Sequence, residues 1–241
     1  MEINFLGKWS SNLVTGQRNV SFLLDDKIVF DFGPHSLESL LDRNLDPNNI
    51  ETLLISHMHL DHYAGLAELL WYRSIYKAKN RLTVIGPKGI RRNTDLLLKL
   101  LNTPAPWYGE QITPNTEYIE DVNTDFVRVF RASHTIPCNA YRVEYGGKTI
   151  FYSGDTSYSE EIAEGAIGVD WLLHETTYTD KDREPANFWG HSTWSDAMEV
   201  FKKSGARHFV PVHLTQSSSE LVLSMVGKVE GLVYPPDTLK L

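Results

Sequence analysis

The stretch Ser56-His57-Met58-His59-Leu60-Asp61-His62 closes a short apolar segment and opens a helical pattern of leucines. Four of its seven residues carry side chains that can bind a metal ion. His57 and His59 stand two positions apart and can point to the same side of a turn, whereas Asp61 and His62 enter the helix and can reach a point a few ångströms away. This arrangement suits two adjacent cations better than one.

Three further potential ligands lie in the second half of the chain. His134, Asp155 and His213 each come directly after, or close, a run of residues with the apolar pattern of a β-strand. Because the downstream ends of strands can meet at one edge of a sheet, we expect these three side chains to converge with His57.

The hydrophobic pattern predicts two β-rich halves, each with helices of its own. A single domain over residues 1–241 is expected, since the chain is 41% hydrophobic and long enough to bury one sizeable core. The predicted strands cover 2–6, 18–24, 27–32, 51–55, 82–85, 126–130, 140–145, 149–152, 171–173 and 208–212. Helices are predicted to begin near 36, 61, 159 and 193, and another follows the helix entry at 86–89 and runs through 96–100.

Composition excludes some classes of protein. The formal charge is −8, with 31 acidic and 23 basic residues, which is the wrong sign for a protein held to nucleic acid mainly by a diffuse basic surface. The turn at residues 6–10 lacks the G-x-G-x-x-G spacing of a dinucleotide site.

The compartment is also suggested by the composition. Residues 1–6 read directly as a first strand rather than a leader, and no run of 18 apolar residues occurs, so we expect a soluble, cytoplasmic protein without a membrane anchor. The single cysteine, Cys138, cannot form an internal disulfide and is expected to be a small buried hydrophobe.

The H-x-H-x-D-H string at 57–62 resembles the metal-binding signature of the metallo-β-lactamase superfamily, and the resemblance extends over essentially the whole chain. Two further strings, Leu172-Leu173-His174-Glu175-Thr176-Thr177 and Trp189-Gly190-His191-Ser192-Thr193, resemble the H-E-[AT]-T and G-H-S-T motifs of its ribonuclease Z branch and phosphodiesterase relatives. Together with the two β-rich halves, the resemblance implies an α/β (α+β) fold, the four-layer αββα metallo-β-lactamase sandwich.

The resemblance also implies a set of metal ligands. Zinc fits nitrogen and carboxylate ligands best, with manganese and iron as alternatives. A hydroxide shared by two cations is the implied nucleophile, and Asp61 is expected to orient it or to take its proton. One metal would be held by His57, His59, His134 and Asp155, and the other by Asp61, His62, His213 and the same Asp155 as a bridge.

A candidate general acid lies in the second of the two motifs. An alkoxide released from phosphorus needs a proton, and a histidine outside the metal ligands can supply it. We assign this role to His191, with Glu175 fixing its tautomer and raising its pKa. The alternative for His191 is a residue that only precedes a helix cap, and His174 is expected to be structural.

One feature of the transfer-RNA-processing ribonuclease Z enzymes is missing. Their long RNA-gripping arm is inserted between the positions that match His134 and Asp155, an interval that here holds two plain strands. The motifs therefore predict a phosphodiesterase or ribonuclease Z-like nuclease acting on a small phosphodiester or a flexible RNA, with full transfer-RNA binding doubtful.

Two other functions stay open. A lactonase or β-lactamase-type hydrolase would use the same hydroxide on a carbonyl and would not need His191 or Glu175. A metal-stabilised binding protein would hold metal and hydrolyse nothing.

The substrate depends on two predicted loops, 103–114 and 180–189. Their aromatic residues, Trp107, Tyr108, Phe188 and Trp189, either stack on a base or only pack. Members of the family often form homodimers, so the resemblance implies a possible homodimer here.

Overall fold

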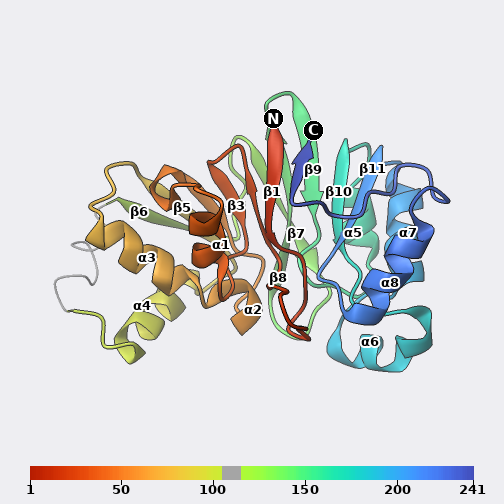
Figure 1. Cartoon of the computed structure of the whole chain (residues 1–241), viewed down its shortest axis with the longest axis horizontal. Helices are drawn as coiled ribbons and strands as arrows, with labels where there is room; N and C mark the ends of the chain where they lie inside the picture. Colours follow the sequence, from red (N-terminus) through yellow and green to blue (C-terminus); the bar gives the residue numbers. More distant parts are fainter. Residues whose placement is uncertain (105–114) are drawn as a thin grey trace.

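The computed structural model describes residues 1–104 and 115–241, and in these ranges two β-sheets stand face to face (Figure 1). The first sheet has seven strands in the order β12-β1-β2-β3-β4-β5-β6, and the second has five in the order β11-β10-β9-β8-β7. The first-sheet strands are β1 (Glu2–Gly7), β2 (Ser21–Leu24), β3 (Ile28–Phe30), β4 (Thr52–Leu54), β5 (Leu82–Gly86), β6 (Thr116–Glu120) and β12 (Thr238–Lys240). The second-sheet strands are β7 (Val127–Ala132), β8 (Cys138–Tyr145), β9 (Lys148–Tyr152), β10 (Trp171–Glu175) and β11 (His208–Val212).

Helices cover the outer face of each sheet, which gives four layers (Figure 1). On the first sheet lie α1 (Ser36–Asp42), α3 (Leu66–Ile75) and α4 (Ile90–Leu100), and on the second lie α5 (Glu160–Gly165), α7 (Trp194–Ser204) and α8 (Gln216–Met225). Two short helices, α2 (Leu60–Tyr63) and α6 (Arg183–Trp189), lie at one end of the sandwich. The predicted αββα arrangement is confirmed.

Strand alternation sorts the apolar side chains into three clusters. Phe22, Phe30 and Tyr152 belong to the central cluster between the two sheets, where the Tyr152 ring meets the Phe22 ring edge-on at 5.1 Å. Neighbouring residues on the same strands, such as Leu23 and Phe151, face the outer helices. Inner strands such as β2, β3 and β4 are therefore buried on both faces, as expected for the middle of a sandwich, whereas the edge strands β6 and β12 are partly exposed.

Parallel pairing places several strand ends at one edge. Strands β3, β4, β5 and β6 run parallel to one another, and so do β9, β10 and β11. Their carboxyl ends point toward the end of the sandwich that carries α2 and α6 (Figure 1). The polar segments that follow β4, β9 and β11 therefore meet there, which is the convergence expected from the sequence.

Some predicted elements differ from the structure. Residues 180–189 were expected to form a loop, but they hold a short 3-10 turn, Asp180–Asp182, and then α6. A helix is possible there because Pro185 lies within the first turn of α6, where its missing N–H costs no helical hydrogen bond. Strands β6 and β12 and helix α8 were not predicted, because their polar residues weaken the periodic signal.

The helix expected to start at Asp61 and continue through the leucines is interrupted. Helix α2 ends at Tyr63, and α3 begins at Leu66 after Gly65. Within the described residues, no helix is both long and apolar enough to cross a membrane.

Candidate metal centre

The first group of imidazoles lies where β4 ends and β7 turns into β8. His57 Nε2 lies 3.0 Å from His59 Nδ1, and His134 Nε2 lies 3.2 Å from the same Nδ1 atom. His57 is fully buried, while His59 and His134 are partly exposed. Three nitrogens from two sheets therefore face one point.

The second group joins α2 to the end of β11. His213 Nε2 lies 3.4 Å from Asp61 Oδ2, and His62 Nε2 lies 3.5 Å from the same oxygen. Asp155 connects the groups, because its Oδ2 atom lies 3.3 Å from His62 Nε2, 3.3 Å from His213 Nε2 and 3.6 Å from His57 Nε2. The structure thus brings together all seven residues that the sequence proposed as ligands.

These separations fit a metal ion better than direct hydrogen bonds. Ligand atoms at about 2.0–2.1 Å from a tetrahedral zinc ion lie about 3.4 Å from one another, close to the separations found here. Two buried atoms, His62 Nε2 and Asp155 Oδ1, have no hydrogen-bond partner. Unpaired buried polar atoms are costly, and a bound cation would satisfy them.

The protonation states point the same way. Burial lowers the pKa of His57, His59 and His134, so these imidazoles are neutral, which is the form that binds a cation. Burial also opposes a charge on His62, but the carboxylates of Asp155, Asp61 and Asp31 outweigh it and raise the His62 pKa well above its usual range. The three carboxylates therefore stabilise a positive charge at the position of His62.

The other ring nitrogen of four histidines is held by an outward hydrogen bond. His57 Nδ1 lies 3.0 Å from Ser56 Oγ, and His134 Nδ1 lies 2.8 Å from the Gly190 carbonyl oxygen. His213 Nδ1 lies 2.7 Å from Thr177 Oγ1. In His62, Nδ1 lies 2.8 Å from Asp31 Oδ2. Such bonds fix the ring orientation and leave Nε2 facing the centre.

Asp31 is a functional residue that the sequence reasoning missed. It is fully buried and accepts from the Ser56 backbone N–H at 2.6 Å, the Ser56 hydroxyl at 2.8 Å and the Tyr152 hydroxyl at 2.6 Å, besides His62. A carboxylate inside the apolar run 28–32 was the available signal, because a buried charge requires partners.

Two glycines allow the ligand segment to approach the first sheet closely. A Cβ atom on Gly33 would lie 1.8 Å from the Asp61 carbonyl oxygen, and one on Gly65 would lie 2.3 Å from the Gly33 carbonyl oxygen. Phe32 N–H also donates to the His62 carbonyl at 2.7 Å. The backbone after β3 therefore contacts the backbone of α2 closely and positions Asp61 and His62. A residue larger than glycine at position 33 or 65 would prevent this contact.

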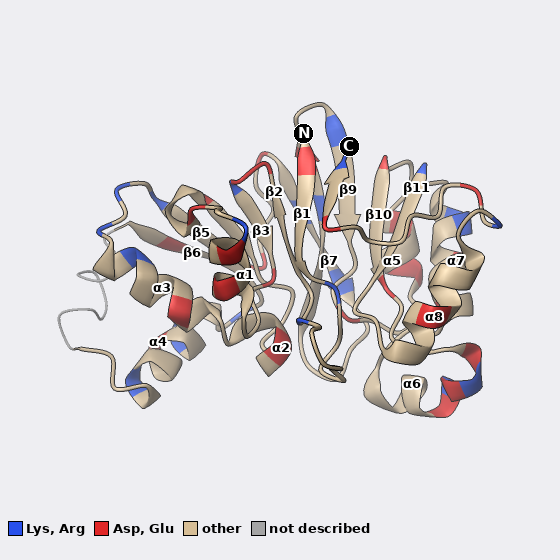
Figure 2. Cartoon of the chain, in the orientation of Figure 1, with Lys and Arg blue, Asp and Glu red and all other residues tan. Residues whose placement is uncertain are grey.

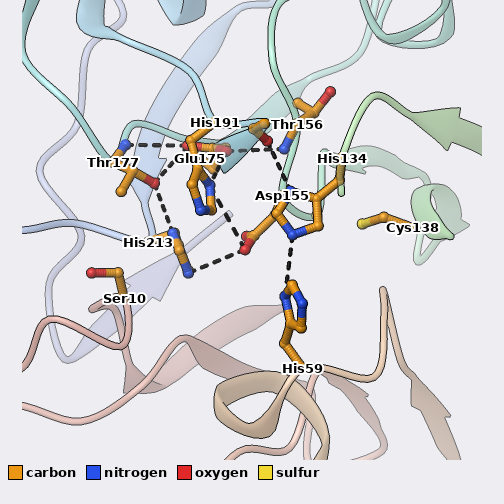
Figure 3. Close-up of polar contacts among 12 residues, drawn as sticks. Ser10, His59, His134, Cys138, Asp155, Thr156, Glu175, Thr177, His191 and His213 are labelled. Atoms are coloured by element: carbon orange, nitrogen blue, oxygen red, sulfur yellow. Dashed lines mark hydrogen bonds and ion pairs between the residues drawn. The ribbon is translucent and has the colours of Figure 1, made fainter. Parts of the chain in front are cut away.

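The pair Glu175 and His191 lies beside the centre (Figure 3). Glu175 Oε1 is 2.8 Å from His191 Nδ1, and this imidazole nitrogen is 3.9 Å from Asp155 Oδ2. Burial alone would lower the His191 pKa, but the Glu175 carboxylate raises it to about 9. His191 therefore carries a proton at neutral pH and, with Nδ1 bound to Glu175, has Nε2 free to donate it.

Thr177, which was quoted in a motif but given no role, connects this pair to the metal centre (Figure 3). Its Oγ1 atom lies 2.6 Å from Glu175 Oε2 and 2.7 Å from His213 Nδ1. The hydroxyl donates to the carboxylate and accepts from the imidazole, so Glu175 holds His191 directly and His213 through Thr177.

The other residues singled out in the sequence do not belong to the ligand cluster. His174 is buried, and its Nδ1 atom donates to the Glu175 carbonyl at 2.6 Å. Cys138 is buried, as expected. Phe188 and Trp189 lie on α6, whereas Trp107 and Tyr108 lie outside the described residues.

A cavity of about 440 Å³ opens onto the centre. His59, His134, Asp155, His191 and His213 contribute to its lining. The ligand cluster and the protonated imidazole therefore face the same space, which is large enough for a small substrate.

Comparison with known proteins agrees with this fold. Residues 27–214 match the Beta-lactamase superfamily domain, and the chain belongs to this family. A ribonuclease Z from Bacillus cereus is 28% identical, with 89% of each chain covered. The crystal structure of the short form of human tRNase Z covers 100% of this chain and 99% of its own, at 23% identity and a TM-score of 0.78. A diphosphatase from the PhnP family covers 100% of this chain and 97% of its own, at 16% identity and a TM-score of 0.75.

Within the superfamily, the chain is a metal-dependent hydrolase of the metallo-β-lactamase fold, with ribonuclease Z among its relatives. In the described interval between His134 and Asp155 there is no long RNA-binding arm, since β8 and β9 are joined directly by the turn at Gly146 and Gly147.

Proposed function

We propose that the chain is a dinuclear metal-dependent phosphodiesterase of the ribonuclease Z type, acting on a small nucleotide diester or a flexible RNA. The observation that carries this proposal is the Glu175 and His191 pair, held at 2.8 Å beside the ligand cluster. An alkoxide leaving a phosphodiester gains from a positioned proton donor, and this pair can supply the proton.

The ligand sets would be those expected from the sequence, with zinc as the proposed metal. One group consists of His57, His59 and His134, the other of Asp61, His62 and His213, and Asp155 lies between them. Two bound cations would supply an activated water and would offset charge on the phosphoryl oxygens.

Residues of this chain would then guide the protons. His62 and His213 outweigh the effect of burial and hold the pKa of Asp61 well below its usual range, so Asp61 stays ionised and acts as an orienting acceptor rather than a strong base. His191 donates its proton to the leaving oxygen, and Glu175 stabilises the imidazolium before that step.

The test compares leaving groups of different basicity on zinc-loaded and manganese-loaded protein. For a dinucleotide, which releases an alkoxide, His191→Ala is expected to lower kcat by about 10²-fold or more. For bis(p-nitrophenyl) phosphate, whose phenolate leaves without a proton, the loss should be much smaller. If a lactone or β-lactam is hydrolysed instead and His191→Ala has no effect, the carbonyl hydrolase is the correct function.

Three other expectations from the sequence stay predictions. They are the cytoplasmic location, the homodimer and the single domain over 1–241.

A further inference from the structure

The mouth of the cavity carries exposed apolar side chains. Trp189, Tyr178 and Leu60 line it, and the side chains of Trp189 and Leu60 are 55% and 68% exposed. Phe188 packs against Trp189 edge-on at 4.9 Å and is itself 73% exposed. Exposed apolar groups at the entrance of a site mark a surface that a ligand covers.

Trp189 is fixed relative to the candidate acid. It is the last residue of α6, and Gly190 follows with a φ of 68°. The Gly190 carbonyl accepts from His134 Nδ1 at 2.8 Å, and His191 N–H donates to the Ala186 carbonyl at 2.9 Å. The backbone that carries Trp189 is therefore fixed two residues from the candidate proton donor, and Trp189 lines the same cavity as His191.

Charge is arranged differently from a polyanion site. The described residues that line the cavity include Asp61 and Asp155 but no lysine or arginine. Arg183, on α6, is paired with Asp196 at 3.0 Å. Lysine and arginine residues are spread over separate elements along the chain instead of forming a band at this end (Figure 2). Phosphates beyond the one at the metal centre would find no lysine or arginine in the cavity wall, where the protonated His191 is the cation next to the candidate ligands.

We infer that Trp189 forms a stacking subsite for a nucleobase next to the scissile diester, and that the cavity selects its substrate by stacking rather than by charge. The inference rests on the proposed function and names its substrate class: a singly charged diester with a flat aromatic base beside it. Base stacking on an aromatic side chain tolerates any base, so the subsite selects for a base without reading its identity.

The first experiment measures steady-state kinetics with three substrates. They are a dinucleotide, the same dinucleotide without its 5′ base, and the same dinucleotide without its 3′ base. Trp189→Ala should raise KM for the dinucleotide by roughly tenfold or more, within the range that one stacked base contributes. It should leave KM nearly unchanged for the abasic substrate that lacks the stacked base. Trp189→Phe should restore most of the loss. An equal change for all substrates would show a structural role and overturn the inference.

The second experiment measures the salt dependence of kcat/KM with the same dinucleotide and with longer RNA. A substrate held by one phosphate at the centre should show a slope of log kcat/KM against log salt of about −1 or shallower. A steep slope, with longer RNA preferred, would contradict selection by stacking.

The third experiment does not depend on hydrolysis. Adenosine, which carries no phosphate, should quench part of the tryptophan fluorescence of the wild-type protein but much less that of Trp189→Phe, which keeps the stacking ring and loses the reporter. Equal quenching in both proteins would contradict the subsite. If the wild type hydrolyses no diester but Trp189 is quenched, the proposed function fails and the subsite stands.

Discussion

The Asp31 carboxylate lies 2.8 Å from Nδ1 of His62, and both side chains are fully buried. This bond turns His62 Nε2 toward Asp61 and Asp155. The same carboxylate reaches Ser56, which in turn contacts His57. Asp31 therefore orients histidines from both groups of the metal centre without facing the centre itself.

Removal of this orienting carboxylate should weaken metal binding. We expect Asp31→Asn to lower zinc affinity by roughly 10–100-fold, as is typical when the partner of a ligating histidine is lost. Competition with a chromophoric chelator measures the change. Tyr152→Phe, which removes only one donor to Asp31, is the matched control and should cost less. Unchanged affinity in Asp31→Asn would show that His62 keeps its orientation by packing alone.

Metal removal should lower thermal stability. The centre joins segments from both sheets, so a cation bound only to the folded state stabilises it by about 2.7 kcal/mol at a concentration of 100 times its Kd, or roughly 5–10 °C in Tm. Calorimetry with and without chelator checks this. Asp155→Ala, which lacks the carboxylate between the two groups, should lose most of the metal-dependent shift; a full shift in this variant would contradict the assigned ligands.

Activity should fall at high pH. His191 donates in its protonated form, and its pKa is raised to about 9, so kcat/KM should decline as pH rises through about 9. Glu175→Gln removes the carboxylate that raises this pKa, so the decline should begin at lower pH. Glu161→Gln, which changes an exposed carboxylate on α5, is the control and should leave the profile in place. An identical profile in Glu175→Gln would exclude His191 as the titrating group.

Loss of the Thr177 hydroxyl should destabilise the protein and disturb His213. Thr177→Val keeps the shape but leaves Glu175 Oε2 and His213 Nδ1 each without this partner, at an expected cost of about 1–3 kcal/mol in the free energy of unfolding. Urea denaturation of the metal-free protein measures the cost separately from metal binding. Thr177→Ser should restore both contacts, and a Val variant as stable as wild type would contradict the network.

A methyl group at Gly33 should displace the ligand segment. Its Cβ would lie 1.8 Å from the Asp61 carbonyl oxygen, so the backbone must move, and we expect Gly33→Ala to cost about 1–3 kcal/mol or more and to weaken metal binding. Gly86→Ala meets only the Ile90 side chain, at 3.0 Å or beyond, and should cost less. Equal effects in the two variants would show that the Gly33 contact is not specific to the centre.

The sequence predicted those parts of the site that depend on residue type and position along a strand. His57, His134, Asp155 and His213 each follow a strand, and parallel strand ends meet at one edge, so their convergence could be expected. Asp31 could not be assigned in this way, because its role depends on contacts with Ser56, which follows the neighbouring strand β4, and with Tyr152 of the other sheet. Trp189 was placed in a loop, although the structure presents it at the end of α6.

The two groups of ligands also have a consequence for the order in which the protein acquires its metal. Asp61 and His213 are 152 positions apart in the chain but lie 3.4 Å apart in the fold. During synthesis the histidines near residue 57 emerge long before His213, so a growing chain presents an incomplete set of ligands. A metal that needs the full set of candidate ligands would therefore bind late, after β11 has been made and the two sheets have packed together.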